Sequence, residues 1–245
     1  MKPPSSHQPS RSLGQYLCST VHEAVHAAID QVLATHVKAC DRLLDVGCWD
    51  GGRTLEHGAA CRADHLCGIE VVEDQAEGAE RRGIAVGRCN LEAAAFPWDD
   101  SFFDVVICNQ VLEQIKDIFG VLDEIARVLK PGGVFVASVP NLASLHSRIM
   151  LLLGLQPSMI RVFGPHVRSF THGEFVQLLT SGGIFQLVEA RGVGFYPLPA
   201  TGLGNFIGRL WPAGSHTPVL VLRRTDVRNF SWRQAYSDAG HQTTM

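Results

Sequence analysis

Apolar residues recur along the chain with two periods, and these periods predict its elements. Between residues 13 and 37 they return at helical spacing, which predicts one long helix. Its apolar stripe consists of Leu17, Val21, Val25, Ile29 and Leu33. Apolar runs predict strands at 43–46, 66–70, 84–89, 104–108 and 134–140, and helices are expected at 54–61, 74–82, 118–129 and 171–181. Strands that alternate with helices predict an α/β domain.

The stretch LLDVGCWDGG, residues 43–52, joins the first strand to the next helix. Gly47 ends the apolar run, and without a Cβ it allows the backbone to approach a ligand closely. The start of the following helix adds N–H groups and a partial positive charge that attract an anionic group. This pattern is typical of the first βα turn of a nucleotide-binding sheet. The alternative is the ordinary βα turn of any parallel sheet.

Polar residues follow two other predicted strands. Glu70 ends LCGIE about twenty residues after Gly47, where an acid can accept hydrogen bonds from both ribose hydroxyls of a nucleoside. The alternative role for Glu70 is a simple helix cap. Asn109 and Gln110 end the strand DVVIC, at the carboxyl edge where open parallel sheets bind ligands. The sequence therefore predicts a nucleotide site at this edge.

Length and composition narrow the function classes. The 245 residues predict one large domain, and 46% hydrophobic residues are enough to build its core. A net charge of −3 without a basic run argues against nucleic-acid binding. Seven cysteines without a CxxC pair, and a start without an apolar signal core, predict reduced thiols and a cytoplasmic protein. We expect no membrane span, because every apolar run is too short.

The two ends of the chain and its first histidines are expected to carry no chemistry. Residues 1–11 are rich in Pro and Ser and are predicted to be disordered, and 233–245 are predicted to form a flexible tail. The main domain then covers 12–232. His22 and His26 have a spacing that suits a metal, but no third ligand joins them in a recognisable pattern. We therefore predict solvated histidines and no metal site.

Taken together, four segments resemble the class I S-adenosylmethionine-dependent methyltransferases. They are LLDVGCWDG, the acid of GIE, SFFDVVICNQVLEQ and DEIARVLKPGGVFVASVPN. The resemblance spans roughly 40–225, and RVLKPGG after FDVVIC is its most specific part. It implies a Rossmann-like seven-stranded sheet with the last strand antiparallel, helices on both faces and a small helical cap after the fifth strand. Residues 184–194 and 217–224 would supply the last two strands.

The resemblance also assigns the cofactor, S-adenosylmethionine. Its methionine end would lie on the glycine loop and the end of the fourth strand, its ribose beside Glu70, and its adenine beside the third strand. The implied contacts are Asp45, Gly47, Cys48, Trp49 and Gly51 for the loop, Glu70 and Val71 for the ribose, Asn90 and Leu91 for the adenine, and Asn109 and Gln110 for the amino-acid end. Glu92 is the alternative to Asn90.

Two departures from the family pattern affect this assignment. Trp49 stands where the family usually has a second glycine, and it can keep the backbone path only if its φ is negative. Gln114 replaces a frequent histidine after the fourth strand, which removes one acid–base candidate. His166 and His146 are the remaining candidates for a general base, because both fall in the segment expected to face the acceptor.

Residues 142–170 are the cap insertion, and we expect their apolar helix to lie over the carboxyl edge as a lid. This segment loosely resembles the caps of methyltransferases related to the methionine-biosynthesis W protein. The alternatives are a packing helix, or a membrane-surface role, which the lack of a basic cluster on this helix disfavours. Residues 193–212 are rich in Gly and Pro and are expected to form a long functional loop.

The leading hypothesis is an enzyme that methylates an oxygen of a small-molecule, sugar or lipid-like acceptor. The fourth strand lacks the Asn-Pro-Pro-Tyr-like run of enzymes that methylate bases or glutamine, because Asn109-Gln110-Val111-Leu112 follows it. A nicotinamide dehydrogenase requires GxGxxG, which Gly47-Cys48-Trp49 interrupts. A non-catalytic S-adenosylmethionine-binding regulator or partner subunit is the third hypothesis, favoured by Trp49 and the missing histidine.

Overall fold

The computed structural model describes residues 13–93, 95–157, 159–160, 163–198 and 200–242, so the predicted disordered segment 1–11 lies outside it. Seven strands form one sheet in the order β3-β2-β1-β4-β5-β7-β6. They are β1 (Arg42–Val46), β2 (His65–Ile69), β3 (Ala85–Gly87), β4 (Phe103–Asn109), β5 (Leu129–Ser138), β6 (Phe185–Val193) and β7 (Thr217–Arg224). Strand β7 runs antiparallel to both neighbours, and the other pairs are parallel. The implied seven-stranded topology is confirmed.

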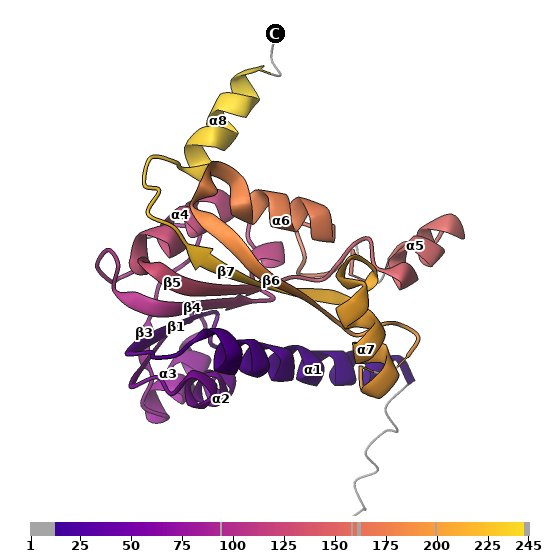
Figure 1. Ribbon diagram of the computed structural model, residues 1–245, viewed down its shortest axis with the longest axis horizontal. Helices are drawn as coiled ribbons and strands as arrows, with labels where there is room; N and C mark the ends of the chain where they lie inside the picture. The colour runs from indigo at the N-terminus through magenta and orange to yellow at the C-terminus, as the bar shows by residue number, and fades with distance from the viewer. Residues whose placement is uncertain (1–12, 94, 158, 161–162, 199, 243–245) are drawn as a thin grey trace, which may run out of the picture.

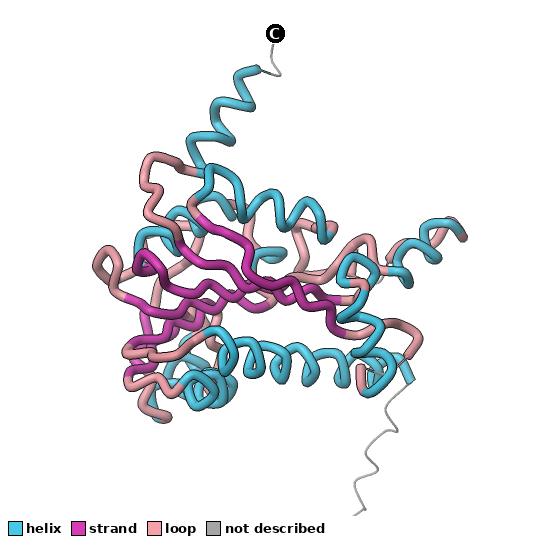
Figure 2. The backbone as a smooth tube through the Cα atoms, in the orientation of Figure 1, coloured by secondary structure: helices cyan, strands magenta, loops and turns pink. Residues whose placement is uncertain are grey.

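Helices cover both faces of the sheet (Figures 1 and 2). One face carries α1 (Leu13–His36), α2 (Gly52–Cys61) and α3 (Glu73–Arg81), and the other carries α4 (Ile118–Val128), α6 (His172–Thr180) and α8 (Trp232–Gln242). Two further helices, α5 (Leu145–Leu152) and α7 (Gly202–Leu210), lie at one end of the sheet. Short 3-10 turns are η1 (Leu112–Gln114), η2 (Ser181–Gly183) and η3 (Pro212–Gly214). In the described part of the chain, no helix combines the length and apolarity that a membrane crossing requires.

The alternation of side chains along β4 divides the core into two layers. Val105 and Ile107 pack with the helix α1, whereas Val106 and Cys108 pack with α4. All four side chains are fully buried, because successive residues of a central strand point to opposite faces and both faces are covered. The sheet is therefore a rigid platform, and its carboxyl edge is where the chain can present functional groups.

Two segments that the sequence predicts to be irregular are helical instead. Residues 193–212, expected as a loop, contain α7, whose Gly204 and Gly208 are buried. A Cβ at Gly192 of β6 would collide with the carbonyl oxygen of Gly208, so glycine permits this close packing rather than a turn.

The segment from residue 233 to Gln242, which the sequence predicts to be part of a flexible tail, continues the helix α8. Asp123 of α4 accepts hydrogen bonds from the Trp232 N–H (2.9 Å) and the Ser231 hydroxyl (2.7 Å). The Trp232 ring is buried and donates to the Leu178 carbonyl. These tertiary contacts, which no local pattern reveals, fix the start of the helix. Residues 243–245 lie outside the described part.

Candidate functional site

A cavity of about 760 Å³ opens where β1, β2, β3 and β4 end. It is lined by ten of the eleven residues that the sequence assigns to the cofactor: Asp45, Gly47, Cys48, Trp49, Glu70, Val71, Asn90, Leu91, Asn109 and Gln110. Gly51, at the start of α2, does not line the cavity. A Cβ at this position would point toward Ile84 and Ala79 instead. Parallel strands end at one edge of the sheet, and this brings residues far apart in sequence together.

The glycine loop bends tightly after β1. Gly47 has φ 81°, and a Cβ there would lie 2.7 Å from the Val111 side chain. The N–H groups of Gly47 and Cys48 both donate to the Ile69 carbonyl of β2. Only glycine fits this left-handed, crowded position without strain.

Trp49 keeps the loop path in a different way from the one the sequence predicts. Its φ is 50°, which is positive, so the backbone has the conformation that a glycine would adopt. The requirement for a negative φ is therefore wrong. Trp49 is 58% exposed and is part of the cavity wall. An aromatic residue thus replaces glycine at the expense of backbone strain.

Glu70 is the fixed carboxylate of the site. The residue is buried, and its Oε1 accepts hydrogen bonds from the N–H groups of Val71 and Val72, each at 2.8 Å. Its Oε2 accepts one from the Trp49 N–H at 3.1 Å. A carboxylate offers about four acceptor positions, two on each oxygen, so one position remains on Oε2. The three backbone donors hold Glu70 in place beside the cavity.

A second carboxylate, Asp45, lies at the other side of the glycine loop. Its Oδ2 accepts a hydrogen bond from the buried Thr54 hydroxyl at 2.7 Å. Burial raises the pKa of Asp45, although the nearby His57 opposes this shift. An ammonium group in the cavity would reverse the shift, because an opposite charge favours the ionised carboxylate.

Three histidines and an aspartate contact one another between α1 and α2. His26 Nδ1 lies 3.2 Å from His57 Nε2, and His57 Nδ1 lies 2.6 Å from Asp30 Oδ1. The His22 ring packs edge-on against His26 at 4.6 Å. Burial, and then the neighbouring His57, lowers the pKa of His26 to about 3, so its ring is neutral near pH 7.

The prediction of solvated histidines is wrong for His26, which is buried together with His57. His22, His26 and His57 all line the cavity, and the sequence assigns none of them to the site. The spacing of His22 and His26 was the available signal, but nothing local places His57 of α2 beside them. Among the described residues, no group of three metal-ligating side chains has the geometry of a metal site.

The end of β4 completes the wall. Gln110 has φ 57°, and its carbonyl accepts a hydrogen bond from the Gln114 side chain at 2.8 Å. The Asn109 side chain accepts a hydrogen bond from the Ser138 hydroxyl of β5. Glu92 also lines the cavity and accepts a hydrogen bond from the Lys116 N–H. Asn90 and Glu92 therefore both line the cavity next to the third strand.

The two predicted bases lie away from this wall. His166 Nδ1 is 2.9 Å from the Met159 carbonyl, and its Nε2 is 3.9 Å from Oε1 of the buried Glu113. The His146 ring packs against Tyr196 with 4.9 Å between centroids. Neither histidine is among the residues that line the cavity, and their catalytic role stays a prediction.

The expectation of a lid is not met by α5. Within the described residues, none of α5 lines the cavity, and the helix projects away from the body of the molecule (Figure 1). Leu152 is 86% exposed, so the apolar face of the helix has no partner over the carboxyl edge. The helical insertion after the fifth strand exists, but it does not cover the site.

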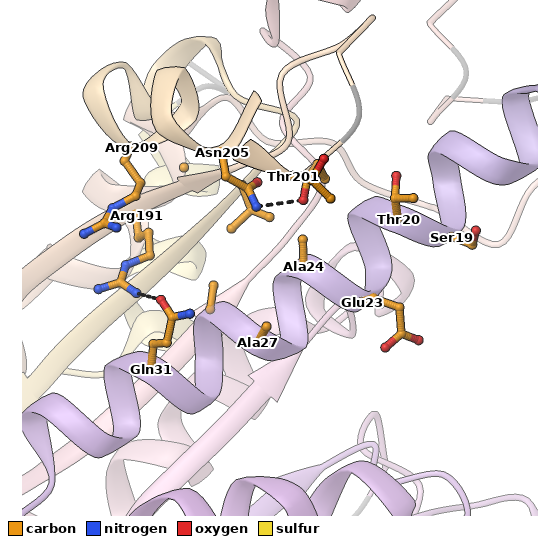
Figure 3. A pocket seen from close by; sticks show the side chains of 14 residues that line it. Ser19, Thr20, Glu23, Ala24, Ala27, Gln31, Arg191, Thr201, Asn205 and Arg209 are labelled. Atoms are coloured by element: carbon orange, nitrogen blue, oxygen red, sulfur yellow. Dashed lines mark hydrogen bonds between the residues drawn. The ribbon is translucent and has the colours of Figure 1, made fainter. Parts of the chain in front are cut away.

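A second cavity, of about 500 Å³, lies between α1, β6 and α7 (Figure 3). Its wall is formed by Ala24, Ala27 and other small residues, with Arg191 and Arg209 on the side of β6 and α7. Arg191 donates to Gln31 at 2.9 Å. The carboxylate of Glu23 pairs with Arg53 instead of facing a ligand. Of these two cavities, only the first has the geometry of a nucleoside site, with an acid at a strand end.

Comparison with known proteins identifies the family. The model of the methyltransferase domain matches residues 15–190, which is more than half of the chain. The chain belongs to the methyltransferase domain family. Ubiquinone biosynthesis O-methyltransferases are among its relatives. That of Methylococcus capsulatus is 30% identical over 188 residues, 73% of this chain and 77% of that protein. That of Marinobacter nauticus is 36% identical over 106 residues, 40% and 44% respectively.

Solved structures confirm that the chain has the class I methyltransferase fold. An S-adenosylmethionine-dependent methyltransferase from Mesorhizobium loti superposes with a TM-score of 0.57 over 83% of this chain and 100% of that one, at 18% identity. The chain spans less than half of the length of several curated relatives that it matches, between 43% and 45%. Family and fold are thus shown, and they imply S-adenosylmethionine as the cofactor.

The residues of the chain fit this cofactor. A nucleoside needs a fixed acid at the end of β2, and Glu70 is held there by three backbone N–H groups. A methionine end needs close approach to the glycine loop, and Gly47, which has no Cβ, lines the cavity there. The volume of the cavity lies in the range of sites for molecules of this size.

Proposed function

We propose that this protein transfers the methyl group of S-adenosylmethionine to an oxygen of a small, lipid-like or sugar acceptor. The observation that carries the proposal is the immobilised Glu70 carboxylate beside a cavity that the glycine loop keeps open. The relatives named as ubiquinone biosynthesis O-methyltransferases support an oxygen acceptor. The run Asn109-Gln110-Val111-Leu112, which differs from that of base-methylating and glutamine-methylating enzymes, supports it as well.

In this proposal each part of the wall has one task. Oε2 of Glu70 accepts a hydrogen bond from a ribose hydroxyl, and Asn90, Leu91 or Glu92 borders the adenine. Asp45 faces the ammonium of the methionine end, and the backbone carbonyl groups of 109–110 orient its chain. The bound cofactor supplies an electrophilic methyl group. The cavity keeps water out and holds the acceptor in line with that methyl group. This alignment makes the main contribution to the rate of methyl transfer.

Proton removal from a hydroxyl acceptor is the least constrained part of the proposal. His166 and His146 stay the candidates, because histidine titrates near neutral pH. Their distance from the wall favours a reaction that depends mainly on positioning. The cytoplasmic location that the sequence predicts is part of the same proposal, supported by the six free cysteines of the described residues.

The first prediction tests the role of Glu70. A charged group that accepts hydrogen bonds contributes about 1.5–3 kcal/mol, so Glu70→Ala is expected to weaken S-adenosylmethionine binding by about tenfold or more. Isothermal titration calorimetry measures the dissociation constant. Asp74→Ala removes the same charge from an exposed position on α3 and is expected to leave the affinity unchanged. Unchanged affinity in folded Glu70→Ala would exclude Glu70 from the site.

A methyl-transfer assay, combined with the binding titration, separates the proposed enzyme from a non-catalytic binder. We expect transfer of a labelled methyl group from S-adenosylmethionine to at least one member of a panel of phenolic, sugar and lipid-like hydroxyl acceptors. Binding without transfer to any of them would favour the regulator or partner subunit. Transfer to amines alone would retain the enzyme and overturn the oxygen acceptor.

A further inference from the structure

Helix α7 has its small side chains inside and its large apolar side chains outside. Gly204 and Gly208 are buried against β6, whereas Leu203, Phe206 and Leu210 are 63%, 59% and 72% exposed. A surface helix normally turns its apolar stripe toward the core. The inverted arrangement leaves a strongly apolar helix face without a partner within the described residues, and such faces mark interaction sites.

Helix α5 adds a second apolar surface. Leu151 and Leu152 are 55% and 86% exposed, and the following Leu153 and Leu155 are also exposed. Figure 1 shows that α5 projects beyond the body of the molecule rather than packing on it. A helix that offers several leucines to water on a protrusion is unfavourable for an isolated molecule, because each exposed side chain forgoes its burial free energy.

The two helices stand at the same end of the molecule. Arg148 of α5 lies over the Trp211 ring that follows α7, 5.8 Å from its centroid, and Asn141 donates to the carbonyls of Ala213 and Ser215. Segment 139–155 leaves the carboxyl end of β5, the edge at which the cofactor cavity opens. We call α5 with residues 153–155, together with α7 and Trp211, the apolar edge.

The charged side chains of the apolar edge itself have one sign, whereas Glu23 of α1, which lines the second cavity together with Arg209, pairs with Arg53. The chain contains no Asp or Glu from residue 125 through 173, and none from 190 through 225, although its net charge is −3. Both segments of the apolar edge lie inside these acid-free stretches. Arg148 and Arg209 are exposed on α5 and α7. No single helix carries both cations, so local sequence does not reveal the pair, and the fold brings Arg148 and Arg209 to one edge.

We propose that the apolar edge docks the protein on the surface of an anionic phospholipid bilayer. The exposed leucines and Phe206 would enter the boundary between headgroups and acyl chains, and the arginines would face the anionic headgroups. A protein partner requires a complementary surface with a polar rim. The apolar edge instead combines a projecting helix, α5, with the outward face of α7, and its own charged side chains are cations. A fluid bilayer accommodates such a surface without shape complementarity.

Vesicle flotation with the full chain tests this docking. Three double variants are compared with the wild type: Leu152→Ser with Phe206→Ser, Arg148→Gln with Arg209→Gln, and the control Val188→Ser with Val227→Ser, which changes exposed apolar residues outside the apolar edge. The wild type and the control are expected to float with vesicles that contain phosphatidylglycerol, and weakly with phosphatidylcholine alone. We expect the apolar variant to lose binding by at least tenfold, and the arginine variant by about thirtyfold at low salt.

Three outcomes would overturn the docking proposal: no flotation of the wild type, full flotation of the apolar variant, or a dimer in light scattering that the apolar variant dissociates. The last outcome would assign the apolar edge to a second copy of the chain. Flotation needs no S-adenosylmethionine, and Glu70→Ala is expected to float like the wild type. Failure of the docking and failure of the proposed function are thereby measured separately.

Discussion

At the scale of single residues, Trp49 stores strain in the glycine loop. A non-glycine residue at positive φ is less stable than glycine by about 1–2 kcal/mol, which the greater chain entropy of unfolded glycine partly offsets. Since both variants lack the indole, Trp49→Gly is expected to exceed Trp49→Ala in unfolding free energy by about 0.5–1 kcal/mol. Urea denaturation measures the difference.

The same two substitutions at an exposed position of α3 are expected to differ in unfolding free energy with the opposite sign. Glu77 is exposed in that helix, where Glu77→Gly is expected to be less stable than Glu77→Ala by roughly 0.5–1 kcal/mol. If alanine were the more stable substitution at Trp49 as well, the left-handed conformation of the loop would be refuted.

Residue by residue, the sequence predicts the parts of the site that lie next to a strand end. Gly47 and Glu70 follow buried apolar runs directly, so local pattern alone places them at the carboxyl edge. The His26–His57 contact joins two helices whose packing no local pattern encodes. The sign of φ at Trp49 is equally hidden, because the loop takes its path from the Glu70 carboxylate and the Ile69 carbonyl.

At the scale of elements, Asp123 of α4 anchors the start of α8. Its carboxylate accepts hydrogen bonds from the Ser231 hydroxyl and from the N–H groups of Trp232 and Arg233. It thus acts as an N-cap that comes from another helix. Asp123→Ala is expected to lower the free energy of unfolding by about 1–2 kcal/mol, the effect of losing such a cap.

The control for this anchor is Asp226→Ala. Asp226 is exposed after β7 and is expected to contribute less than about 0.5 kcal/mol. Thermal unfolding followed by circular dichroism compares the two variants. Equal stability of Asp123→Ala and the wild type would mean that α8 is not anchored through this carboxylate.

Periodicity predicts the elements of the sheet because burial on two faces imposes it. The last two strands are expected from the family resemblance instead, and the boundaries of β7 agree with its 217–224, and those of β6 with its 184–194 to within a residue. Helix α7 escapes prediction because its glycines serve packing against β6 and not a turn. Helix α8 is not predicted either, because its sequence is polar and its start is fixed by contacts with α4. The same cause, contact with a distant element, produces both errors.

At the scale of the whole molecule, stability depends on pH through the buried Glu113. Both its carboxylate oxygens lack a hydrogen-bond partner in the described part of the chain, and burial raises the pKa of Glu113 to about 7. Between its ordinary pKa of 4.5 and about 7 the folded protein binds more protons than the unfolded chain. Protonation of Glu113 therefore stabilises the folded protein. This contribution to the free energy of unfolding is complete below the ordinary pKa and is lost as pH rises through 7.

Glu113→Gln cannot titrate and provides the comparison. From about pH 4.5 to 8 the wild type is expected to lose roughly 2–3 kcal/mol of unfolding free energy relative to this variant. Chemical denaturation at several pH values measures the difference between the two proteins. A difference that is constant with pH would show that the Glu113 carboxyl is ionised in the fold throughout.

The position of β7 between β5 and β6 has a consequence for the order of assembly during synthesis. Strands β1 to β5 can pair with one another as soon as they leave the ribosome, whereas β6 pairs with β7 alone. Until residues 217–224 are made, the backbone edges of β5 and β6 both remain open, and open edges invite pairing with other chains. The nascent chain therefore depends on its last strand to close the sheet, and this is the interval in which a chaperone gives most protection.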